Sequence, residues 1–413
     1  MSKKISLKHM VVGLLALAFI VPGDSNRKAY IMFMFLLLLF FERKLDYKCL
    51  VGVGTPRWIY VISYVSILLI NYYRWSLPVC SLFLIVFFLG RYIIIQGIND
   101  EHAFNMVVDA VLFVFSIYAI LGIIEAFTRI NVFDIILGRS FELYGANNLR
   151  GSIYRGHGIS TVSINNAMIV YMAWMLATFK LYSRKKLSSI IEYILIGSHL
   201  ILIFSRMLIL VGLISQIIIL TRTKRITKLK VILLITAAIF VSMLIPTEGG
   251  GLVDSMIESF VPLIQELFGG KNHIGAINWG GTGERIIIWQ WVFERMKGKL
   301  LFGNGFTTDF AYRYFYEGHY YTKQSIEVQW LYILFQKGLW GLVGYIVYQI
   351  DAIVHPFLMT KKENGVSFSF VFLVMTCGYF ISLFSCAGLE DVQFFYLFFA
   401  LFEAYERTRI NHA

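Results

Sequence analysis

Apolar runs of membrane-spanning length recur along the chain and constrain its fold more than any other feature. Most are long enough to cross about 30 Å of hydrocarbon as helices. We mark twelve, near residues 8–22, 29–41, 58–72, 76–97, 102–127, 158–180, 187–204, 206–221, 230–246, 326–357, 366–386 and 388–405. Hydrophobic residues make up 58% of the sequence and charged residues only 15%, unlike a soluble protein. The sequence therefore predicts an all-α polytopic membrane protein with about 12 transmembrane helices, in which residues 1–413 form a single integral membrane domain.

The positions of the basic residues predict the orientation. If the N-terminus lies inside and the chain alternates, the short inside segments hold 21 of the 37 lysines and arginines. The reverse orientation would place Arg184–Lys186 and the cluster at 222–230 outside, which the positive-inside rule disfavours. We therefore expect both termini inside, and we interpret much of the net charge of +12 as a topology signal.

Two outside segments stand apart by length, 128–157 and 247–325. The second lies between spans 9 and 10 and is nearly neutral, so orientation does not explain its basic residues. Apolar residues at helical spacing predict helices at 252–268 and 284–300, and a Gly-rich break follows at 301–306. Because long loops often carry function, we expect the 247–325 loop to carry part of a functional site.

Three arginines lie where an anionic ligand at the membrane surface would be. Arg206 follows Ser205 at a tight outside turn between two apolar runs, where an arginine is costly unless paired or hydrated. It is either a snorkelling residue or a phosphate ligand, because a guanidinium grips phosphate oxygens with its planar fork. Arg150 and Arg155 lie in LRGSIYRGHG, whose glycines let a ligand approach the backbone, and the alternative for both is ordinary loop charge.

Aromatic residues are dense in the large outside loop. Trp289 lies in the predicted helix at 284–300, and His319, Tyr320 and Tyr321 follow near the end of the loop. One interpretation is interfacial anchoring, with Tyr and Trp at the headgroup level. The other is a sugar platform, in which aromatic rings pack on the apolar face of a pyranose. Both interpretations can hold at once.

The sequence contains no recognisable metal or cofactor motif. Its four cysteines match no redox or zinc spacing, and it has no phosphate-binding glycine loop in a suitable context. We therefore expect neither a metal nor a cofactor.

Several short motifs follow one another on the expected side of the membrane. They are Arg150-Gly151-Ser152, Ser205-Arg206, Arg285-x-x-x-Trp289, Leu301-Phe302-Gly303-Asn304-Gly305-Phe306, and Leu331 through Gly338-x-x-Gly341. In their order and spacing they resemble the O-antigen polymerase and O-antigen ligase superfamily, whose members are glycosyltransferases that use polyprenyl-pyrophosphate-linked glycans. The resemblance covers roughly residues 130–345. It implies a multi-pass protein of the bacterial inner membrane whose outside loops face the periplasm.

One departure from the family pattern bears on the type of enzyme. The ligases have a His-Asn pair upstream of Gly-x-x-Gly, and this chain has Glu327 and Val328 there. His319 lies eight residues earlier and is the second candidate for a general base. The absence of the ligase histidine favours a polymerase, because polymerases of the superfamily vary more at this point.

The resemblance implies a metal-independent, GT-C-like glycosyl transfer. A repeat-unit glycan leaves one undecaprenyl pyrophosphate and joins the end of another lipid-linked unit. Arg206 and Arg285 are expected to stabilise the departing pyrophosphate, with Arg150 or Arg155 assisting. Glu327 would accept the proton of the acceptor hydroxyl, although an acid at a helix N-terminus also has a purely structural explanation. The glycan-binding residues would be Trp289, His319, Tyr320 and Tyr321.

The partners implied are the lipid-linked oligosaccharide, membrane lipids and a polysaccharide chain-length regulator, with no nucleic acid. Two alternatives stay open. An O-antigen ligase would transfer the glycan to lipid A–core instead. A flippase or transporter would use acids within the spans, for which the candidates are Asp109, Glu125, Glu192 and Asp351, but the sequence shows no inverted repeat.

Overall fold

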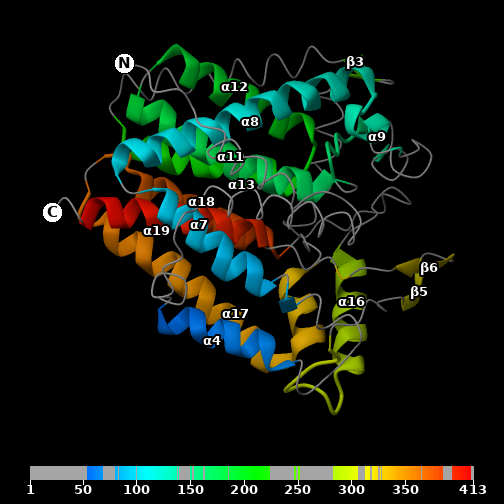
Figure 1. Cartoon of the computed structure of the whole chain (residues 1–413). Coiled ribbons are helices and arrows are strands. Elements are labelled where there is room, and N and C mark those ends of the chain that lie inside the picture. The colour runs from blue at the N-terminus through cyan, green and yellow to red at the C-terminus, as the bar shows by residue number, and fades with distance from the viewer. Residues whose placement is uncertain are drawn as a thin grey trace.

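The computed structural model describes a bundle of helices, most of which run in similar directions (Figure 1). The described residues are 54–67, 80–81, 83–98, 100–136, 138, 149–150, 153–160, 163–184, 186–223, 246–247, 250–251, 282–305, 312–316, 319–323, 326, 328–363, 365–384 and 393–410. The main helices are α4 (Thr55–Val65), α7 (Arg91–Gly97), α8 (Glu101–Thr128), α11 (Ser163–Arg184), α12 (Leu187–Leu202), α13 (Arg206–Thr221), α16 (Thr282–Arg295), α17 (Gln329–Thr360), α18 (Phe368–Ser382) and α19 (Gln393–Ile410). A six-residue π-helix, η1 (Ile85–Gly90), precedes α7, and the short helix α9 (Val132–Ile136) follows α8.

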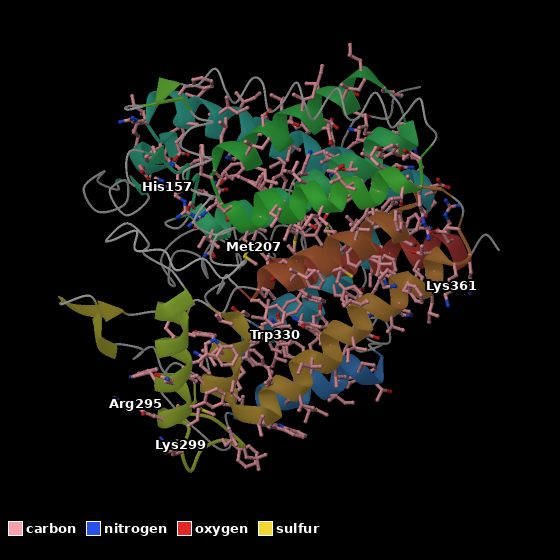
Figure 2. The ribbon with its side chains drawn as sticks, turned by 180° about the vertical axis from the view of Figure 1, so that it is seen from behind. His157, Met207, Arg295, Lys299, Trp330 and Lys361 are labelled. Atoms are coloured by element: carbon pink, nitrogen blue, oxygen red, sulfur yellow. The ribbon has the colours of Figure 1, made fainter. Side chains whose placement is uncertain are left out.

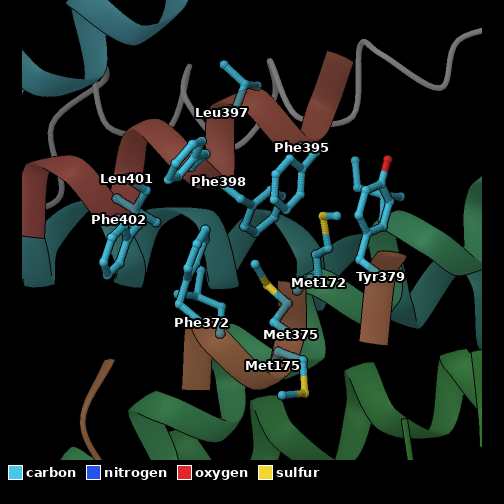
Figure 3. Close-up of a cluster of buried hydrophobic side chains, with 14 of the residues drawn as sticks. Met172, Met175, Phe372, Met375, Tyr379, Phe395, Leu397, Phe398, Leu401 and Phe402 are labelled. Atoms are coloured by element: carbon cyan, nitrogen blue, oxygen red, sulfur yellow. The ribbon is translucent and has the colours of Figure 1, made fainter. Parts of the chain in front are cut away.

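The helices pack in three groups. Helices α8, α11, α12 and α13 lie on one side of the bundle, α4 and α17 lie on the other, and α7, α18 and α19 lie between them (Figure 1). Methionine and aromatic side chains fill the core where α11, α18 and α19 meet (Figure 3). There the ring of Phe372 stacks on that of Phe402 at 4.7 Å, and the ring of Tyr379 stacks on that of Phe395 at 4.9 Å. The middle group therefore holds the two outer groups together.

Local sequence explains where several helices begin and end. The Asp100 carboxylate accepts a hydrogen bond from the Ala103 N–H and caps the start of α8, and the Ser367 hydroxyl does the same for α18. Helix α4 begins with Pro56 in its first turn, where no N–H is needed. Helix α8 ends at Thr128, because the next residue, Arg129, has a left-handed backbone (φ 58°).

The bundle has two ends, which we name after residues labelled in Figure 2. His157 and Met207 lie at one end, and Lys361 lies at the opposite end (Figure 2). Helix α16 and the hairpin β5–β6 lie at the His157 end (Figure 1). The short connections between α11 and α12 and between α17 and α18 lie at the Lys361 end.

Large apolar side chains face outward in stripes at helical spacing. On α8 the exposed apolar residues are Phe113, Ile117, Ile120, Ile124 and Phe127. On α17 they include Leu339, Val343, Ile346, Ile350, Val354 and Phe357. Such faces are unfavourable in water and suit an apolar surrounding. By length and composition, α8 and α17 could each cross a membrane. The part of α17 that follows Gly338, Leu339–Thr360, is roughly 33 Å long at 1.5 Å per residue.

These findings confirm the predicted helical class. Two of the described helices are long and apolar enough to span a membrane, so the number of about 12 spans stays a prediction. The predicted segments at 8–22 and 29–41, nearly all of the predicted segment at 230–246, and the predicted helix at 252–268 lie outside the described residues. The predicted helix at 284–300 is α16, which ends earlier, at Arg295.

Short antiparallel hairpins accompany the helices. In the described residues they are β1 (Leu149–Arg150) with β2 (Ile153–Tyr154), β3 (Pro246–Thr247) with β4 (Gly250–Gly251), and β5 (Tyr312–Tyr316) with β6 (His319–Lys323). The pairing of Tyr316 with His319 fixes the register of the third hairpin. Aromatic residues suit strands, so this part of the aromatic-rich loop forms a hairpin.

Buried ion pairs join four helices toward the Lys361 end. Arg57 on α4 bonds to Asp351 on α17, with Nε to Oδ2 at 3.0 Å, and its guanidinium also contacts Glu403 on α19. Arg91 on α7 bonds to the other oxygen of Glu403, with Nε to Oε2 at 2.6 Å. Two arginines thus face two carboxylates, and the charges balance. Each charged side chain in this group therefore has an oppositely charged partner on another helix.

A second balanced group joins α8, α11 and α12. The Lys180 ammonium bonds to Asp109 Oδ1 at 2.8 Å and to Glu192 Oε2 at 2.7 Å. Arg184 contacts the other oxygen of Asp109 and bonds to the Asn105 carbonyl at 3.1 Å. Asp109 and Glu192 are therefore paired with basic residues, and Asp351 is paired with Arg57. Glu125 accepts hydrogen bonds from Tyr154, His157 and Gly158, so all four acids proposed for transport have partners.

Replacing Glu403 by Gln should destabilise the fold, because it leaves Arg57 and Arg91 buried with one carboxylate too few. Removing one member of a buried pair costs about 3–5 kcal/mol. We expect a clear fall in the thermal unfolding midpoint of the purified protein. Glu406→Gln on the same helix is the matched control, because Glu406 is partly exposed and lies 3.6 Å from His355, and its midpoint should change little. Equal midpoints for the two variants would show that the ion group does not stabilise the bundle.

Candidate functional site

Three of the residues predicted to form the site, Arg155, Arg206 and Trp289, lie on elements at the His157 end. Arg206 is the first residue of α13, directly after Ser205, and is partly exposed. Arg155 is half-buried in the loop between β2 and α11, two residues before His157. Trp289 is exposed on α16 (41%). Figure 2 shows Met207 and His157 at the same end of the bundle. Met207 directly follows Arg206 in the sequence, and His157 is two residues after Arg155.

For the other predicted residues the structure describes less. The backbone of Arg150 lies in β1, that of Arg285 in α16, and those of His319, Tyr320 and Tyr321 in β6. Glu327 lies outside the described residues, although its neighbours Ile326 and Val328 are buried. The predicted meeting of Arg206, Arg285 and Glu327 around one ligand therefore stays a prediction.

Helix α17 is broken near its start, and the motif at 301–305 fills the break. Gly338 has φ 66° and ψ −168°, which separates the first segment, Gln329–Lys337, from the rest of α17. Residues 300–305 dock against this point through four backbone hydrogen bonds of 2.8–3.0 Å, which are Asn304 N–H to Phe335 O, Gly305 N–H to Gln336 O, Leu339 N–H to Leu300 O and Trp340 N–H to Leu301 O. The backbone groups freed by the break are thus satisfied by another segment of the chain.

Glycines are required at this junction for conformation and for space. Gly303 has φ 73°, and an added Cβ would lie 2.5 Å from the backbone of Gln336. A Cβ at Gly338 would overlap the carbonyl of Leu301. The two motifs that the sequence places some thirty residues apart, Leu-Phe-Gly-Asn-Gly and Gly-x-x-Gly, therefore form one backbone-bonded unit, named here the glycine junction (residues 300–305 and 335–341).

Helix α16 packs against the first segment of α17. Ile288 and Val292 from its inner face, and Met296 just after its end, are buried in a cluster with Ile326, Val328, Leu331, Tyr332, Leu334 and Phe335. The ring of Trp291 stacks on that of Phe335 at 5.4 Å. This contact places Arg285, one turn before Ile288 in α16, on a helix that is fixed to the residues flanking Glu327.

The outward face of α16 forms an open hollow. Its volume is about 580 Å³, and it is lined by Trp289, Gln290, Phe293, Glu294 and Lys297. The rings of Trp289 and Phe293 have centroids 5.9 Å apart and are tilted by 32°. The hollow thus combines two aromatic surfaces with an amide, a carboxylate and an ammonium group on an open face of the helix.

A buried polar cluster supports the loop that carries Arg155. Glu125, near the end of α8, accepts hydrogen bonds from the Tyr154 hydroxyl at 2.8 Å, the His157 N–H at 3.0 Å and the Gly158 N–H at 3.1 Å. The His157 ring lies between two carboxylates, with Nδ1 3.3 Å from Glu125 Oε1 and Nε2 3.0 Å from Asp134 Oδ2. His157 is fully buried and Glu125 is 2% exposed.

Sequence reasoning did not find this cluster as a site. Glu125 was considered only as a transport acid, and His157 only as part of the glycine-flanked loop. The available signal was an acid at the outer end of an apolar run together with the Arg-Gly-His-Gly sequence in the next segment. Among the described residues, no three His, Cys, Asp or Glu side chains are arranged to hold a metal ion.

Compared with protein-family models and with curated proteins, the chain matches none.

Replacing Gly303 by Ala should open the glycine junction. The substitution adds about 1–2 kcal/mol of left-handed strain and about 1–3 kcal/mol of overlap with Gln336. Gly298→Ala is the matched control, because Gly298 also has positive φ (78°) but has open space around an added Cβ. We expect Gly303→Ala to lower the unfolding midpoint more than Gly298→Ala and to speed tryptic cleavage at Lys297 and Lys299. Equal behaviour of the two variants would contradict the junction's role.

Proposed function

We propose that this chain is an integral membrane glycosyltransferase that polymerises a surface polysaccharide, as an O-antigen polymerase. It would transfer a glycan from undecaprenyl pyrophosphate to the end of another lipid-linked repeat unit. The observation that carries the proposal is the glycine junction, because it joins two motifs of the resemblance into one structural unit at the end of the bundle that also holds Arg155 and Arg206.

In this proposal the chain has about 12 spans, both termini lie in the cytoplasm of a bacterium, and the His157 end faces the periplasm. The charges of the short connections support this orientation. Basic residues at the Lys361 end are Arg184, Lys186, Arg222, Lys361, Lys362, Arg407 and Arg409. The positive-inside rule assigns short basic connections to the cytoplasm. The outward apolar stripes on α8 and α17 would face lipid.

The reaction needs charge stabilisation more than it needs a cofactor. The bond between the sugar's anomeric carbon and the pyrophosphate oxygen breaks, and a new bond forms to the acceptor oxygen, whose proton passes to a base. Negative charge develops on the released undecaprenyl pyrophosphate, and Arg206 and Arg285 would stabilise it, with Arg150 or Arg155 assisting. Glu327 would be the base, and His319 is the second candidate.

The hollow on α16 suits the glycan. A pyranose can pack on the rings of Trp289 and Phe293 while its hydroxyls bond to Gln290, Glu294 or Lys297. We assign Trp289 to glycan binding on this basis, with His319, Tyr320 and Tyr321 in the neighbouring part of the loop.

A transporter is less well supported. The four acids that would carry ions or protons are held by Arg57, Lys180, Arg184 and the loop at 154–158. Packing and charge balance therefore account for them. An O-antigen ligase uses the same donor, and the choice between the two enzymes depends on the acceptor.

Removing one of the two principal arginines should slow polymerisation. The assay uses the purified protein in nanodiscs, with synthetic undecaprenyl-pyrophosphate-linked repeat units and a chelator present. We expect a ladder of products from the wild type, and a rate about 10²–10³ lower for Arg206→Ala and for Arg285→Ala. Arg295→Ala on the same helix as Arg285 is the control and should retain activity, because Arg295 is exposed and lies over the Trp291 ring. Retained laddering in both test variants would refute the cation assignment.

A gene deletion separates polymerase from ligase. Without the polymerase, single repeat units still reach the lipid A–core, because the ligase is intact. Without the ligase, no glycan is attached to the core. We therefore expect a deletion strain to show core with one repeat unit on a lipopolysaccharide gel. Core without glycan would favour the ligase assignment.

A further inference from the structure

We propose that Glu125 is a positioning residue, which holds the loop carrying Arg155 so that the guanidinium reaches the donor's pyrophosphate. This inference rests on the proposed function. It concerns a carboxylate that the proposed reaction does not use and that lies on a different element from Arg155.

Glu125 fixes the chain on both sides of Arg155. The hydroxyl of the preceding residue, Tyr154, donates a hydrogen bond to Oε1 of Glu125 at 2.8 Å. Two residues after Arg155, the His157 N–H donates to the same oxygen at 3.0 Å, and the Gly158 N–H donates to Oε2 at 3.1 Å. A helix-borne carboxylate thus determines the path of the backbone that carries Arg155.

Further side chains complete the support of the same loop. The Tyr118 hydroxyl accepts a hydrogen bond from the Ile159 N–H at 3.1 Å and donates to Asn166 at 2.7 Å. The Asn131 amide donates to the Gly158 carbonyl at 2.7 Å. The Asn166 amide also donates to the Gly156 carbonyl at 3.4 Å, so the loop is bonded to α8, to α11 and to the residue before α9.

The chemistry requires a carboxylate at position 125. Three O–H and N–H donors converge on its two oxygens, and the His157 ring nitrogen lies 3.3 Å from one of them. A glutamine of the same shape offers one acceptor oxygen, and its amide would present N–H groups to at least one donor. Because Glu125 is 2% exposed, water cannot replace the lost bond.

The test compares Glu125→Gln, Arg155→Ala and the double variant in nanodiscs. One measurement is the affinity for undecaprenyl pyrophosphate without glycan, and the other is the polymerisation rate. We expect Glu125→Gln to weaken binding and to lower the polymerisation rate by a factor of about 10². A displacement of a binding group by about 1 Å can lower a rate by that factor. In the Arg155→Ala background, Glu125→Gln should add no further loss, since its effect acts through Arg155.

Glu101→Gln, an exposed acid at the opposite end of α8, is the matched control and should bind like the wild type. If Glu125→Gln does not fold, Tyr154→Phe serves instead, because it removes one hydrogen bond to Glu125 and keeps the ring. Losses that add in the double variant, or an unchanged Glu125→Gln, would overturn the inference while leaving the polymerase intact.

Other outcomes separate the two proposals. A wild type that binds undecaprenyl pyrophosphate but forms no ladder would refute the polymerase, while the non-additive loss of binding would still support the role of Glu125. A wild type that does not bind undecaprenyl pyrophosphate would overturn the inference.

Discussion

Backbone groups that are freed inside an apolar surrounding must find partners within the protein, and the glycine junction meets this constraint. The break at Gly338 interrupts the hydrogen-bond ladder of α17, whose later part carries an outward apolar stripe. Residues 300–305 restore the lost bonds, so the break is stable only because a distant segment docks there. Helix α16, which leads into this segment, is thereby held beside the first segment of α17.

The two ends of the bundle use charge differently. Toward the Lys361 end, Arg57, Arg91, Asp351 and Glu403 neutralise one another, and so do Lys180, Arg184, Asp109 and Glu192. These groups link the helices to one another. At the His157 end, the Glu125 carboxylate accepts bonds from the backbone of a loop, which fixes the chain between the helices. One end therefore aligns the helices, and the other supports the loop that carries Arg155.

Sequence patterns predicted the features that depend on local chemistry. Apolar runs predicted the helices, and the glycines of LFGNGF predicted the break after the helix at 284–300. The docking of this segment against Gly338 was not predicted, because glycine spacing does not reveal which distant segment approaches it. The partners of Glu125 were not predictable, since periodicity does not reveal which side chain from a later loop returns to a given helix. The hairpin β5–β6 could have been predicted, because a Glu-Gly pair separates two aromatic runs.

Helix α18 connects the two halves of the proposed site. It packs on α13, which begins at Arg206, and on α17, which follows Glu327 in the sequence. The Gln329 N–H donates to the Leu383 carbonyl just after α18 at 3.1 Å, and the Trp330 ring stacks on that of Phe384 at 5.3 Å. The spacing between the Arg206 turn and the start of α17 is thus set by direct contacts through α18. A site built across these helices would be held by the packed bundle rather than by its loops.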